Sequence, residues 1–291
     1  MTVVVVGGAN LDLKARTTAA ALRGTSNPGT LATSPGGVGR NVAENLARLG
    51  TPTVLVAAVG SDHFGDDLLD ATAAAGVDIS HVRQVPGPTG TYLAVLDASG
   101  DLAVGVSDMA ATATLGPDHL DPGLLAAADL VVLDGNLRAD TLVRAWQLAT
   151  EAGVRVVLDP VSVPKAALVA PLLGEHPLWC VTPNSDELAV LGGTVAGLHQ
   201  RGVQHVWVRR GAEGSLLSGP DGEVRLAAVA GEVVDVTGAG DAMLAAFCHA
   251  VLGGADPARA AAYGHAAAAL TVASPQTVRP DLTDALVRSR L

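Results

Sequence analysis

The segment Val233-Val234-Asp235-Val236-Thr237-Gly238-Ala239-Gly240-Asp241-Ala242 is the most informative stretch of this 291-residue chain. Its valines predict a buried strand, and its glycines lead into a helix predicted over residues 239–252. The N–H groups of Gly238, Ala239 and Gly240 then converge at the start of that helix, where free backbone N–H groups bind anions. The segment therefore predicts an anion site within a strand–loop–helix unit.

Asp241 lies in the first turn of this predicted helix. The helix dipole alone favours an acid there. Beside an anion site, however, the same carboxylate is placed to accept the proton of a hydroxyl that attacks a phosphoryl group, and such a base contributes about 10²- to 10⁴-fold to a rate. Phosphoryl transfer otherwise requires chiefly positioning and charge stabilisation. Both interpretations of Asp241 are open at this point.

Strand and helix patterns alternate along the rest of the chain. Short Val/Leu runs predict buried strands at residues 3–6, 53–59, 130–133, 154–158, 178–181 and 206–208. Helical patterns cover residues 64–75 and 139–152. This alternation predicts an α/β fold, a single domain over residues 1–291 with a mostly parallel sheet that helices cover on both faces. Ligands bind such sheets beyond the carboxyl ends of the strands.

A further helix follows Gly36-Gly37 and ends at Gly50. Its apolar residues recur at helical spacing, namely Val38, Val42, Leu46 and Leu49. Its charged residues occupy other faces, namely Arg40, Glu44 and Arg48.

Two segments interrupt the alternation. Residues 11–34 are rich in Thr, Gly and Pro, and residues 89–107 contain β-like runs at 92–96 and 102–106, joined by a predicted hairpin turn at 97–101. We expect these segments to pair into a small sheet that projects from the main domain. Such a sheet is either surface decoration or a lid over a ligand cleft, and the motifs below favour a lid. Residues 219–222 predict another hairpin turn.

The composition excludes several classes of function. The chain has 18 Lys and Arg residues against 29 Asp and Glu, a net charge of −11, and only seven aromatic residues, so we expect no nucleic acid polymer as a partner. Cys180 and Cys248 form neither a disulfide framework nor a zinc motif, which favours the reducing cytoplasm. The apolar stretch at 266–273 is too short to cross a membrane, and the start of the chain does not read as a signal peptide.

The motifs together resemble those of the ribokinase-like (PfkB) sugar and nucleoside kinases. Asp235-x-Thr237-Gly238-Ala239-Gly240-Asp241 resembles the C-terminal signature of that family, and residues 34–41 (SPGGVGRN) resemble the N-terminal one. Further matching segments follow in order at residues 7–12, 59–65, 159–160, 183–187 and 211–214. The resemblance covers nearly the whole chain. It implies a three-layer α/β/α domain with a small β lid, and ATP and Mg²⁺ as cofactors.

The resemblance also implies roles for residues on the substrate side. Asn10 and Asp12 match positions that bind sugar hydroxyls, although the pair is also typical of an Asx turn. Gly36 and Gly37 let the backbone approach the sugar, and alone they would only indicate a helix start. Asn41 is a further ligand for a hydroxyl, and Asp241 is the base.

On the nucleotide side, Asn184 and Glu187 match an Asn-x-x-Glu that organises Mg²⁺, largely through water, in this family. The same residues are typical of a helix N-cap and first turn. Gly211 and Gly214 match a nucleotide-binding turn. His265 matches a position beside the adenine, although a helix histidine is more often structural.

Two further features concern charge. Arg209-Arg210 precedes Gly211, where small residues are commoner in the family, and this cationic pair either reaches the ATP phosphates or is solvated. The resemblance also implies a monovalent-cation site, with K⁺ as the expected ion, at the side chain of Asp235 and the carbonyl of Thr237.

Within the family, the segments at 8–14, 25–29, 34–46, 107–109 and 159–165 are similar to those of pseudouridine kinases. This similarity implies transfer of phosphate from ATP to the 5′-hydroxyl of pseudouridine. Val38 stands where ribokinases usually carry Lys, which argues against ribose. We expect the polar lid residues Ser26, Asn27 and Thr91 to read the base, Asp108 and Asn136 to line the opposite wall, and the lid to mediate a homodimer.

Three alternatives remain open. The first is a kinase for another ribonucleoside or a hexose derivative. The second is an NAD-dependent oxidoreductase, suggested by Gly7-Gly8 after a strand, although the full Gly-x-Gly-x-x-Gly is absent there. The third is a non-catalytic sugar-binding module, for which Asp241 would be dispensable.

Overall fold

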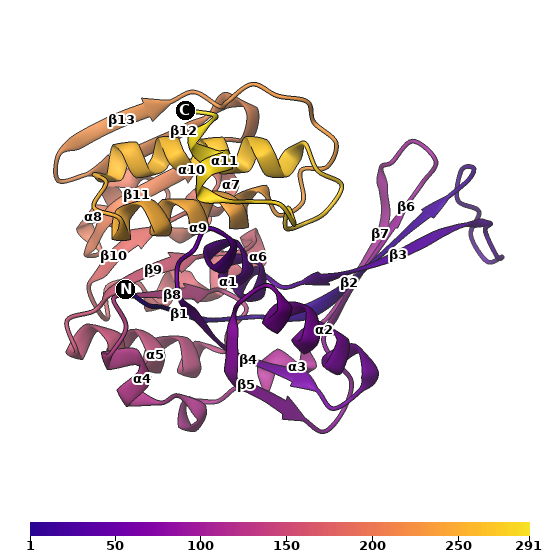
Figure 1. Cartoon of the computed structure of the whole chain (residues 1–291), viewed down its shortest axis with the longest axis horizontal. Helices are drawn as coiled ribbons and strands as arrows, with labels where there is room; N and C mark the ends of the chain where they lie inside the picture. The colour runs from indigo at the N-terminus through magenta and orange to yellow at the C-terminus, as the bar shows by residue number, and fades with distance from the viewer.

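A large, mostly parallel sheet forms the centre of the molecule (Figure 1). The computed structural model describes residues 1–291, the side chain of Leu102 excepted. Across the sheet the strands of the described chain are β13 (Gly222–Leu226), β12 (Ser215–Gly219), β11 (Val203–Arg209), β10 (Leu178–Val181), β9 (Arg155–Asp159), β8 (Leu130–Asp134), β1 (Val3–Val6), β4 (Thr53–Gly60) and β5 (Asp78–Val85). The strands from β11 to β5 are parallel, whereas β12 and β13 form an antiparallel hairpin at one edge. The predicted turn at 219–222 joins that hairpin.

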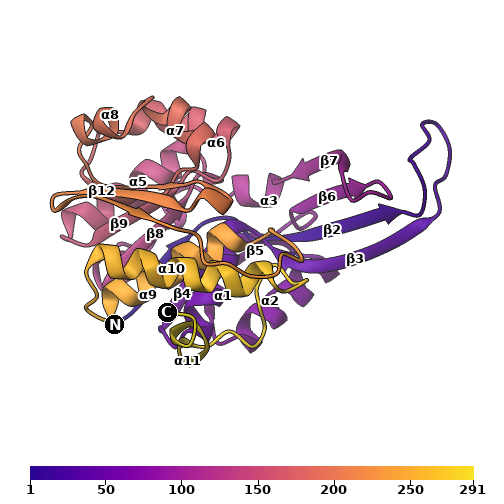
Figure 2. The same cartoon turned by 90° about the horizontal axis from the view of Figure 1, so that it is seen from above.

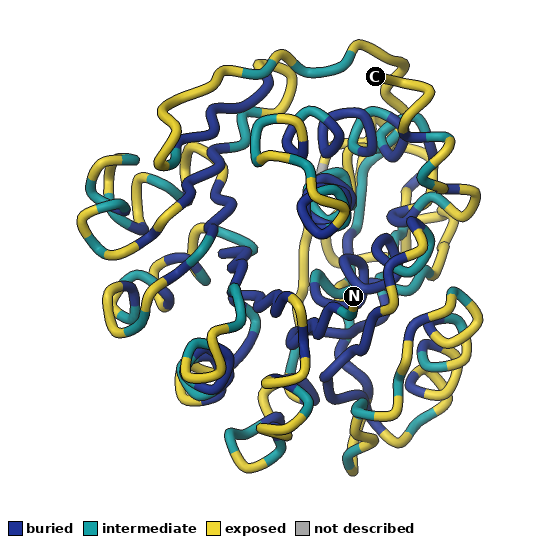
Figure 3. Tube along the Cα trace, turned by 60° about the vertical axis from the view of Figure 1, so that its left-hand side comes forward, coloured by how far each residue is buried: buried dark blue, intermediate teal, exposed yellow. Residues whose placement is uncertain are grey.

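Helices cover both faces of the sheet and make three layers (Figure 2). The four valines of β1 are fully buried, and alternate ones face opposite layers, Val4 and Val6 on one side and Val3 and Val5 on the other. The first face packs against α4 (Pro122–Ala126), α5 (Ala139–Glu151), α6 (Val163–Val169), α7 (Ser185–Leu191) and α8 (Val195–Gln200). The second packs against α1 (Val38–Arg48), α2 (His63–Ala74), α9 (Ala239–Leu252) and α10 (Pro257–Val272). Figure 3 shows the buried strands inside a shell of exposed turns.

A second sheet projects from one end of the domain (Figures 1 and 2). Its order is β3 (Gly29–Gly36), β2 (Asn10–Thr17), β6 (Thr91–Leu96) and β7 (Leu102–Asp108). β2 pairs with β3 antiparallel and with β6 parallel, and β6 and β7 form the predicted hairpin. The expectation that two separate segments pair into one small sheet is confirmed. Short α3 (Ala110–Ala113) follows β7, and α11 (Asp284–Arg288) ends the described elements.

The predicted helices match the structure closely. The helix expected at 239–252 is α9, and α2 and α5 begin and end within one residue of their predicted limits. Within the described part of the chain, none of the helices combines the length and the apolar character needed to cross a membrane. Cys180 and Cys248 are both buried and free.

The strand predicted at residues 233–236 is wrong. This segment is an irregular loop whose three valines are mostly exposed, and the N–H groups of Val234 and Asp235 donate to the carbonyl of Val272 at the end of α10. The segment therefore bonds to the end of α10 and adds no strand to the edge of the sheet. Val233 and Val236 instead line a pocket. A valine run alone does not distinguish these two environments.

Two of the charged side chains of α1 are buried and do not form a solvated helix face. Arg40 and Glu44 are only 2% and 5% exposed. The helix lies between the sheet and its neighbouring elements, and the Nε of Arg40 donates to Thr72 of α2 at 3.2 Å. Helical spacing identified the apolar stripe, but it does not reveal that other elements cover the polar faces.

Candidate active site

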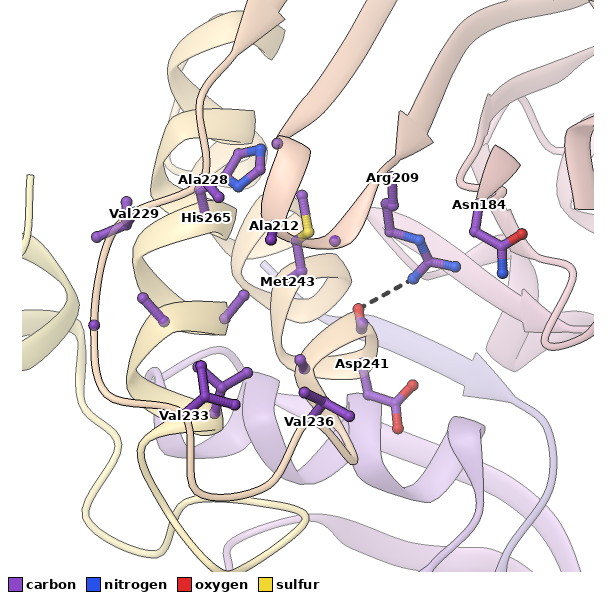
Figure 4. A pocket seen from close by; sticks show the side chains of 18 of the residues that line it. Asn184, Arg209, Ala212, Ala228, Val229, Val233, Val236, Asp241, Met243 and His265 are labelled. Atoms are coloured by element: carbon purple, nitrogen blue, oxygen red, sulfur yellow. Dashed lines mark hydrogen bonds between the residues drawn. The ribbon is translucent and has the colours of Figure 1, made fainter. Parts of the chain in front are cut away.

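A pocket of about 660 Å³ opens at the carboxyl ends of the parallel strands, beside the start of α9 (Figure 4). Its walls come from β9, α7, β11, the loop that precedes α9, and α10. The predicted site residues that line it are Asn184, Glu187, Arg209, Gly211, Gly214, Ala239, Gly240, Asp241 and His265. Residues from segments that are distant in sequence therefore share one cavity.

Asp241 sits in the first turn of α9, where a left-handed glycine sets the direction of the chain. Gly238 is the N-cap with φ +79°, and a Cβ there would lie 2.0 Å from the carbonyl oxygen of Thr277. The Oδ2 atom of Asp241 accepts a hydrogen bond of 2.8 Å from Nδ2 of Asn41 on α1. Two residues that are 200 positions apart are thereby joined.

The pKa of Asp241 is raised to about 7, chiefly by burial of its carboxylate. The hydrogen bond from Asn41 and the charge of Arg209 lower the pKa, while the negative charges of Asp159 and Asp134 raise it. A carboxyl group that titrates near neutrality takes up and releases a proton readily, as a general base must.

The loop before Asp241 forms contacts within itself and with β11. Ala239 N–H donates to the carbonyl of Val236 at a long 3.3 Å, and the carbonyl of Gly240 accepts from Nη1 of Arg209 at 3.3 Å (Figure 4). A Cβ on Gly240 would lie 2.8 Å from that Nη1, so glycine permits the approach. Convergence of the three N–H groups on a bound anion stays a prediction.

Arg209, at the end of β11, is largely enclosed and not solvated, since 14% of its side chain is exposed. Its Nη1 lies 3.0 Å from Asp159 Oδ2, and its Nη2 lies 4.0 Å from Glu187 Oε2. Burial acts to lower the pKa of Arg209, but the two carboxylates raise it, so the guanidinium stays charged. Arg210 is half-buried. Asp159 ends β9, and an acid at the carboxyl end of a buried strand is the sequence signal that identifies it as a site residue.

Asn184 and Glu187 form a reciprocal cap at the start of α7. The Oδ1 of Asn184 accepts from the N–H of Glu187 at 2.9 Å, and Glu187 Oε2 accepts from the N–H of Asn184 at 2.8 Å. Burial raises the pKa of Glu187. The predicted helix cap is therefore confirmed, and both side chains also line the pocket.

His265 on α10 is buried and held by a short relay. Trp207 Nε1 donates to Ser215 Oγ at 2.9 Å, and Ser215 Oγ lies 2.7 Å from His265 Nε2. Because the indole can only donate, the Ser215 hydroxyl is free to donate its own proton to Nε2. Burial lowers the pKa of His265. The ring is thus neutral and anchored at the pocket wall.

Asp134 is a central residue that sequence reasoning missed. Its Oδ2 accepts 2.8 Å bonds from the N–H groups of Gly8 and Gly39, and its Oδ1 accepts from the N–H of Asn136 at 2.9 Å. This buried carboxylate, at the carboxyl end of β8, ties the loop after β1 to the start of α1. The same place on β9 holds Asp159, so an acid that ends a buried strand was the available signal.

The predicted sugar-binding residues lie together where β2, β3 and α1 meet. Asn10 is buried and donates from Nδ2 to Asp12 Oδ1 at 2.8 Å, while burial raises the pKa of Asp12. A Cβ on Gly36 would lie 2.4 Å from that carboxylate, and Gly37, with φ +93°, passes against the backbone of Gly8. The backbone contact and the positive φ require glycine at position 37, whereas a Cβ at position 36 would displace the carboxylate of Asp12.

The predicted base-reading residues do not all come together. Thr91 pairs with Leu11 and Asp108 at the base of the projecting sheet, and the side-chain amide of Asn136 lies beside Gly8. Asp108 is exposed, and its Oδ1 accepts from the N–H of Ala110, at the start of α3.

Ser26 and Asn27, however, lie in the exposed β2–β3 connection at the far end of that sheet (Figure 1). The amide of Asn27 bonds to Leu22 and Thr25 within the same loop. They do not reach the pocket of their own chain, because the connection extends beyond the paired strands.

Asp235 is paired with a lysine. Lys14 Nζ on β2 lies 2.5 Å from Asp235 Oδ2, and Asp235 Oδ1 accepts from the N–H and the Oγ1 of Thr237 at 2.9 and 2.7 Å. Burial acts to raise the pKa of Asp235, but these contacts lower it. An ammonium group thus lies beside Asp235, one of the two ligands that we expected for a monovalent cation.

The chain is similar to kinases over nearly its whole length. Residues 1–284 match the family described as "pfkB family carbohydrate kinase". Pseudouridine kinase of Escherichia coli K12 is 33% identical over 302 residues, covering 99% of this chain and 95% of that protein. An uncharacterized sugar kinase of the same organism, YeiI, is 34% identical over 295 residues, covering 96% and 80%.

A solved structure agrees with these relatives. The structure of Arabidopsis thaliana ribokinase complexed with ribose and ATP superposes with a TM-score of 0.86, at 26% identity, and covers 99% of this chain and 97% of that one. The predicted ribokinase-like three-layer fold is confirmed. The chain belongs to the pfkB family of carbohydrate kinases.

Proposed function

We propose that this kinase transfers the γ-phosphoryl group of ATP to the 5′-hydroxyl of pseudouridine. In this reaction the 5′-oxygen forms a bond to Pγ, the bond from Pγ to the bridging oxygen of ADP breaks, and the hydroxyl proton passes to Asp241. The observation that carries the proposal is the position of Asp241, which faces the pocket and is bonded to Asn41 beside the Gly36-Gly37 turn. Resemblance to a pseudouridine kinase across 99% of the chain supports the choice of nucleoside.

The substrate side supplies hydroxyl ligands. Asn10 and Asp12 hold each other at 2.8 Å and offer acceptors and a donor to a ribose diol. Asn41 and the backbone at Gly36 and Gly37 complete this side. In the proposal Asp241 Oδ1 takes the proton, because Oδ2 is already held by Asn41.

The nucleotide side supplies charge and shape. Membership of a kinase family implies ATP, and we assign its base to His265 and its phosphates to the turn at Gly211 and Gly214, the start of α9 and Arg209. Among the described residues no group of three or more His, Cys, Asp or Glu side chains would hold a metal alone. Mg²⁺ needs only one or two carboxylates when phosphates and water complete its shell. Glu187, acting through a water molecule, fits that role. Bound there, Mg²⁺ would neutralise charge on the phosphates.

We further propose that the projecting sheet is a lid formed by residues 11–34 and 89–107. Leu31, Val104 and Val106 are more than half exposed on it, and its edge strands β3 and β7 lack further partners within the described chain. A second copy of the chain would cover such a surface. In a homodimer of this kind, Ser26 and Asn27 would contact the partner rather than their own pocket.

The proposal is tested by measuring ATP-dependent phosphorylation of pseudouridine, uridine, adenosine, ribose and fructose under the same conditions. We expect the highest kcat/KM for pseudouridine. A much higher value for a free sugar would refute the nucleoside assignment but not the kinase, and the 34% identity to a sugar kinase makes that the second candidate.

A further inference from the structure

Arg40 is a buried arginine whose guanidinium is fully engaged by the protein. Its Nη1 donates to Asn41 Oδ1 at 2.8 Å and to the carbonyl of Pro35 at 3.3 Å. Its Nε donates to Thr72 Oγ1 at 3.2 Å, and its Nη2 is paired with Glu44. All three nitrogens are thus used at a side chain that is 3% exposed. Arg40 is therefore placed to hold neighbouring groups and not to bind a phosphate.

The contact with Asn41 determines which way that amide points. A guanidinium can only donate hydrogen bonds, so the group of Asn41 that faces it must be the acceptor Oδ1. The amide nitrogen Nδ2 is then directed to the other side, where it donates to Asp241 Oδ2 at 2.8 Å. A flipped amide would set two donors against each other at Arg40 and two acceptors against each other at Asp241.

We infer that Arg40 is a positioning residue for Asp241, acting through the amide of Asn41. Arg40 holds Oδ1 of Asn41, Asn41 holds Oδ2 of Asp241, and the remaining Oδ1 of Asp241 is left for the hydroxyl of the acceptor. The role of Asp241 as a base rests on the proposed function, whereas the orientation of the three side chains does not.

Arginine suits this place better than lysine would. Its planar fork serves Asn41, Thr72 and Glu44 at the same time, which a single ammonium does not. Burial lowers the pKa of Arg40 to about 10, with the nearby charge of Arg48 acting in the same direction, so the group still carries its proton at neutral pH. The donor to Asn41 is therefore present throughout the pH range in which Asp241 titrates.

Charged groups from several elements face Asp241 and must be considered with Arg40. Asp159 on β9 and Asp134 on β8 raise its pKa, and Arg209 on β11 lowers it. The hydrogen bond from Asn41 also lowers it. Release of the Asn41 amide should consequently raise the pKa of Asp241 while the other groups are unchanged.

The test compares Arg40→Lys with Arg48→Met. Lysine keeps a cation opposite Glu44 but loses the fork to Asn41. Arg48 pairs with the same Glu44 at 2.6 Å and provides the matched control, because its removal disturbs that ion pair without touching Asn41. In Arg40→Lys we expect kcat for the best acceptor to fall about 10-fold and the acid limb of its pH profile to move up by about one pH unit, with KM for ATP unchanged. Arg48→Met should keep the wild-type profile.

A double-mutant cycle separates action through Asn41 from a direct effect. If Arg40 acts through the amide, adding Arg40→Lys to Asn41→Ala should change neither kcat nor the pH profile further. A full additional loss in the double variant would overturn the inference. Should Arg40→Lys fail to fold, Thr72→Val removes the hydrogen bond from Nε of Arg40 instead. It should move the acid limb of the pH profile in the same direction by a smaller amount.

A second measurement makes the test independent of the acceptor. The carboxyl pKa of Asp241 is measured by ¹³C NMR on protein without substrate, and the signal is assigned by its loss in Asp241→Asn. An unchanged pKa in Arg40→Lys and in Thr72→Val overturns the inference whatever the substrate. If the pKa rises as expected but no acceptor in the panel is phosphorylated, the proposed function fails and the positioning role of Arg40 stands.

Discussion

Replacement of Asp241 by asparagine should slow the enzyme and stabilise the fold at the same time. Asparagine keeps the shape of the side chain and an acceptor for Asn41, but it cannot take a proton. We therefore expect kcat to fall by about 10²-fold or more, with little change in nucleoside or ATP binding. The effect on stability follows from the pKa of about 7 that burial gives to this group, against an ordinary value of 3.8.

The sign of the stability effect depends on pH. Because the folded state holds this proton more tightly than the unfolded state, ionised Asp241 destabilises the fold increasingly as the pH rises from about 4 to about 7. A shift of about 3 pH units at ~1.4 kcal/mol per unit corresponds to a cost of up to about 4 kcal/mol at pH 8, and about 2 kcal/mol at pH 5. The asparagine variant escapes this cost, so its advantage over wild type should grow between pH 5 and pH 8.

Urea and thermal unfolding at pH 5, 6.5 and 8, combined with kcat on the same preparations, check these expectations. For a chain of this length we expect a melting temperature several degrees higher than wild type at pH 8. Asp140→Asn is the matched control, since Asp140 is an exposed first-turn acid of α5 whose pKa is lowered by Arg138. That variant should lose a little stability and no activity. Near-wild-type kcat with reduced stability in Asp241→Asn would refute the base and favour a helix-start role.

Three further predictions follow from the site. Arg209→Met leaves Asp159 and Glu187 without their buried cation, so we expect a loss of about 3 kcal/mol in the free energy of unfolding and a higher KM for ATP; unchanged urea unfolding would contradict the ion pair. Lys14→Met removes the ammonium group beside Asp235, so we expect the rate of this variant to rise with K⁺ but not with tetramethylammonium, the control salt. A rate that does not respond to K⁺ would argue against a cation site at Asp235. Deletion of residues 89–107 should raise KM for the nucleoside more than for ATP, and equal losses with an intact circular dichroism spectrum would count against a lid.

Much of the fold could be predicted from local sequence, because helices, strands and turns depend on residues that are close together in the chain. The valines of β1 mark a strand buried on both faces, and the glycines before α9 mark a chain reversal that Gly238 makes with a positive φ. The order of the motifs likewise placed Asn184 and Gly211 after strands and Asp241 at the start of a helix, and all three line one pocket. Strand–helix alternation leaves few ways to arrange such elements.

Tertiary structure alone decided what surrounds these residues. Hydrophobic spacing marked the apolar stripe of α1, but only packing shows that Arg40 is buried and directs Asn41 toward Asp241, which lies 200 positions away. The same valine pattern that makes a strand elsewhere makes a pocket wall at 233–236.

The sequence by itself therefore determined which chemical groups stand at the ends of which elements, because helix and strand formation depend on near neighbours. It did not determine the titration of Asp241 or the partners of Arg209 and Lys14. Those depend on burial and on charges brought together from distant segments, and electrostatic interactions act through space and not along the chain.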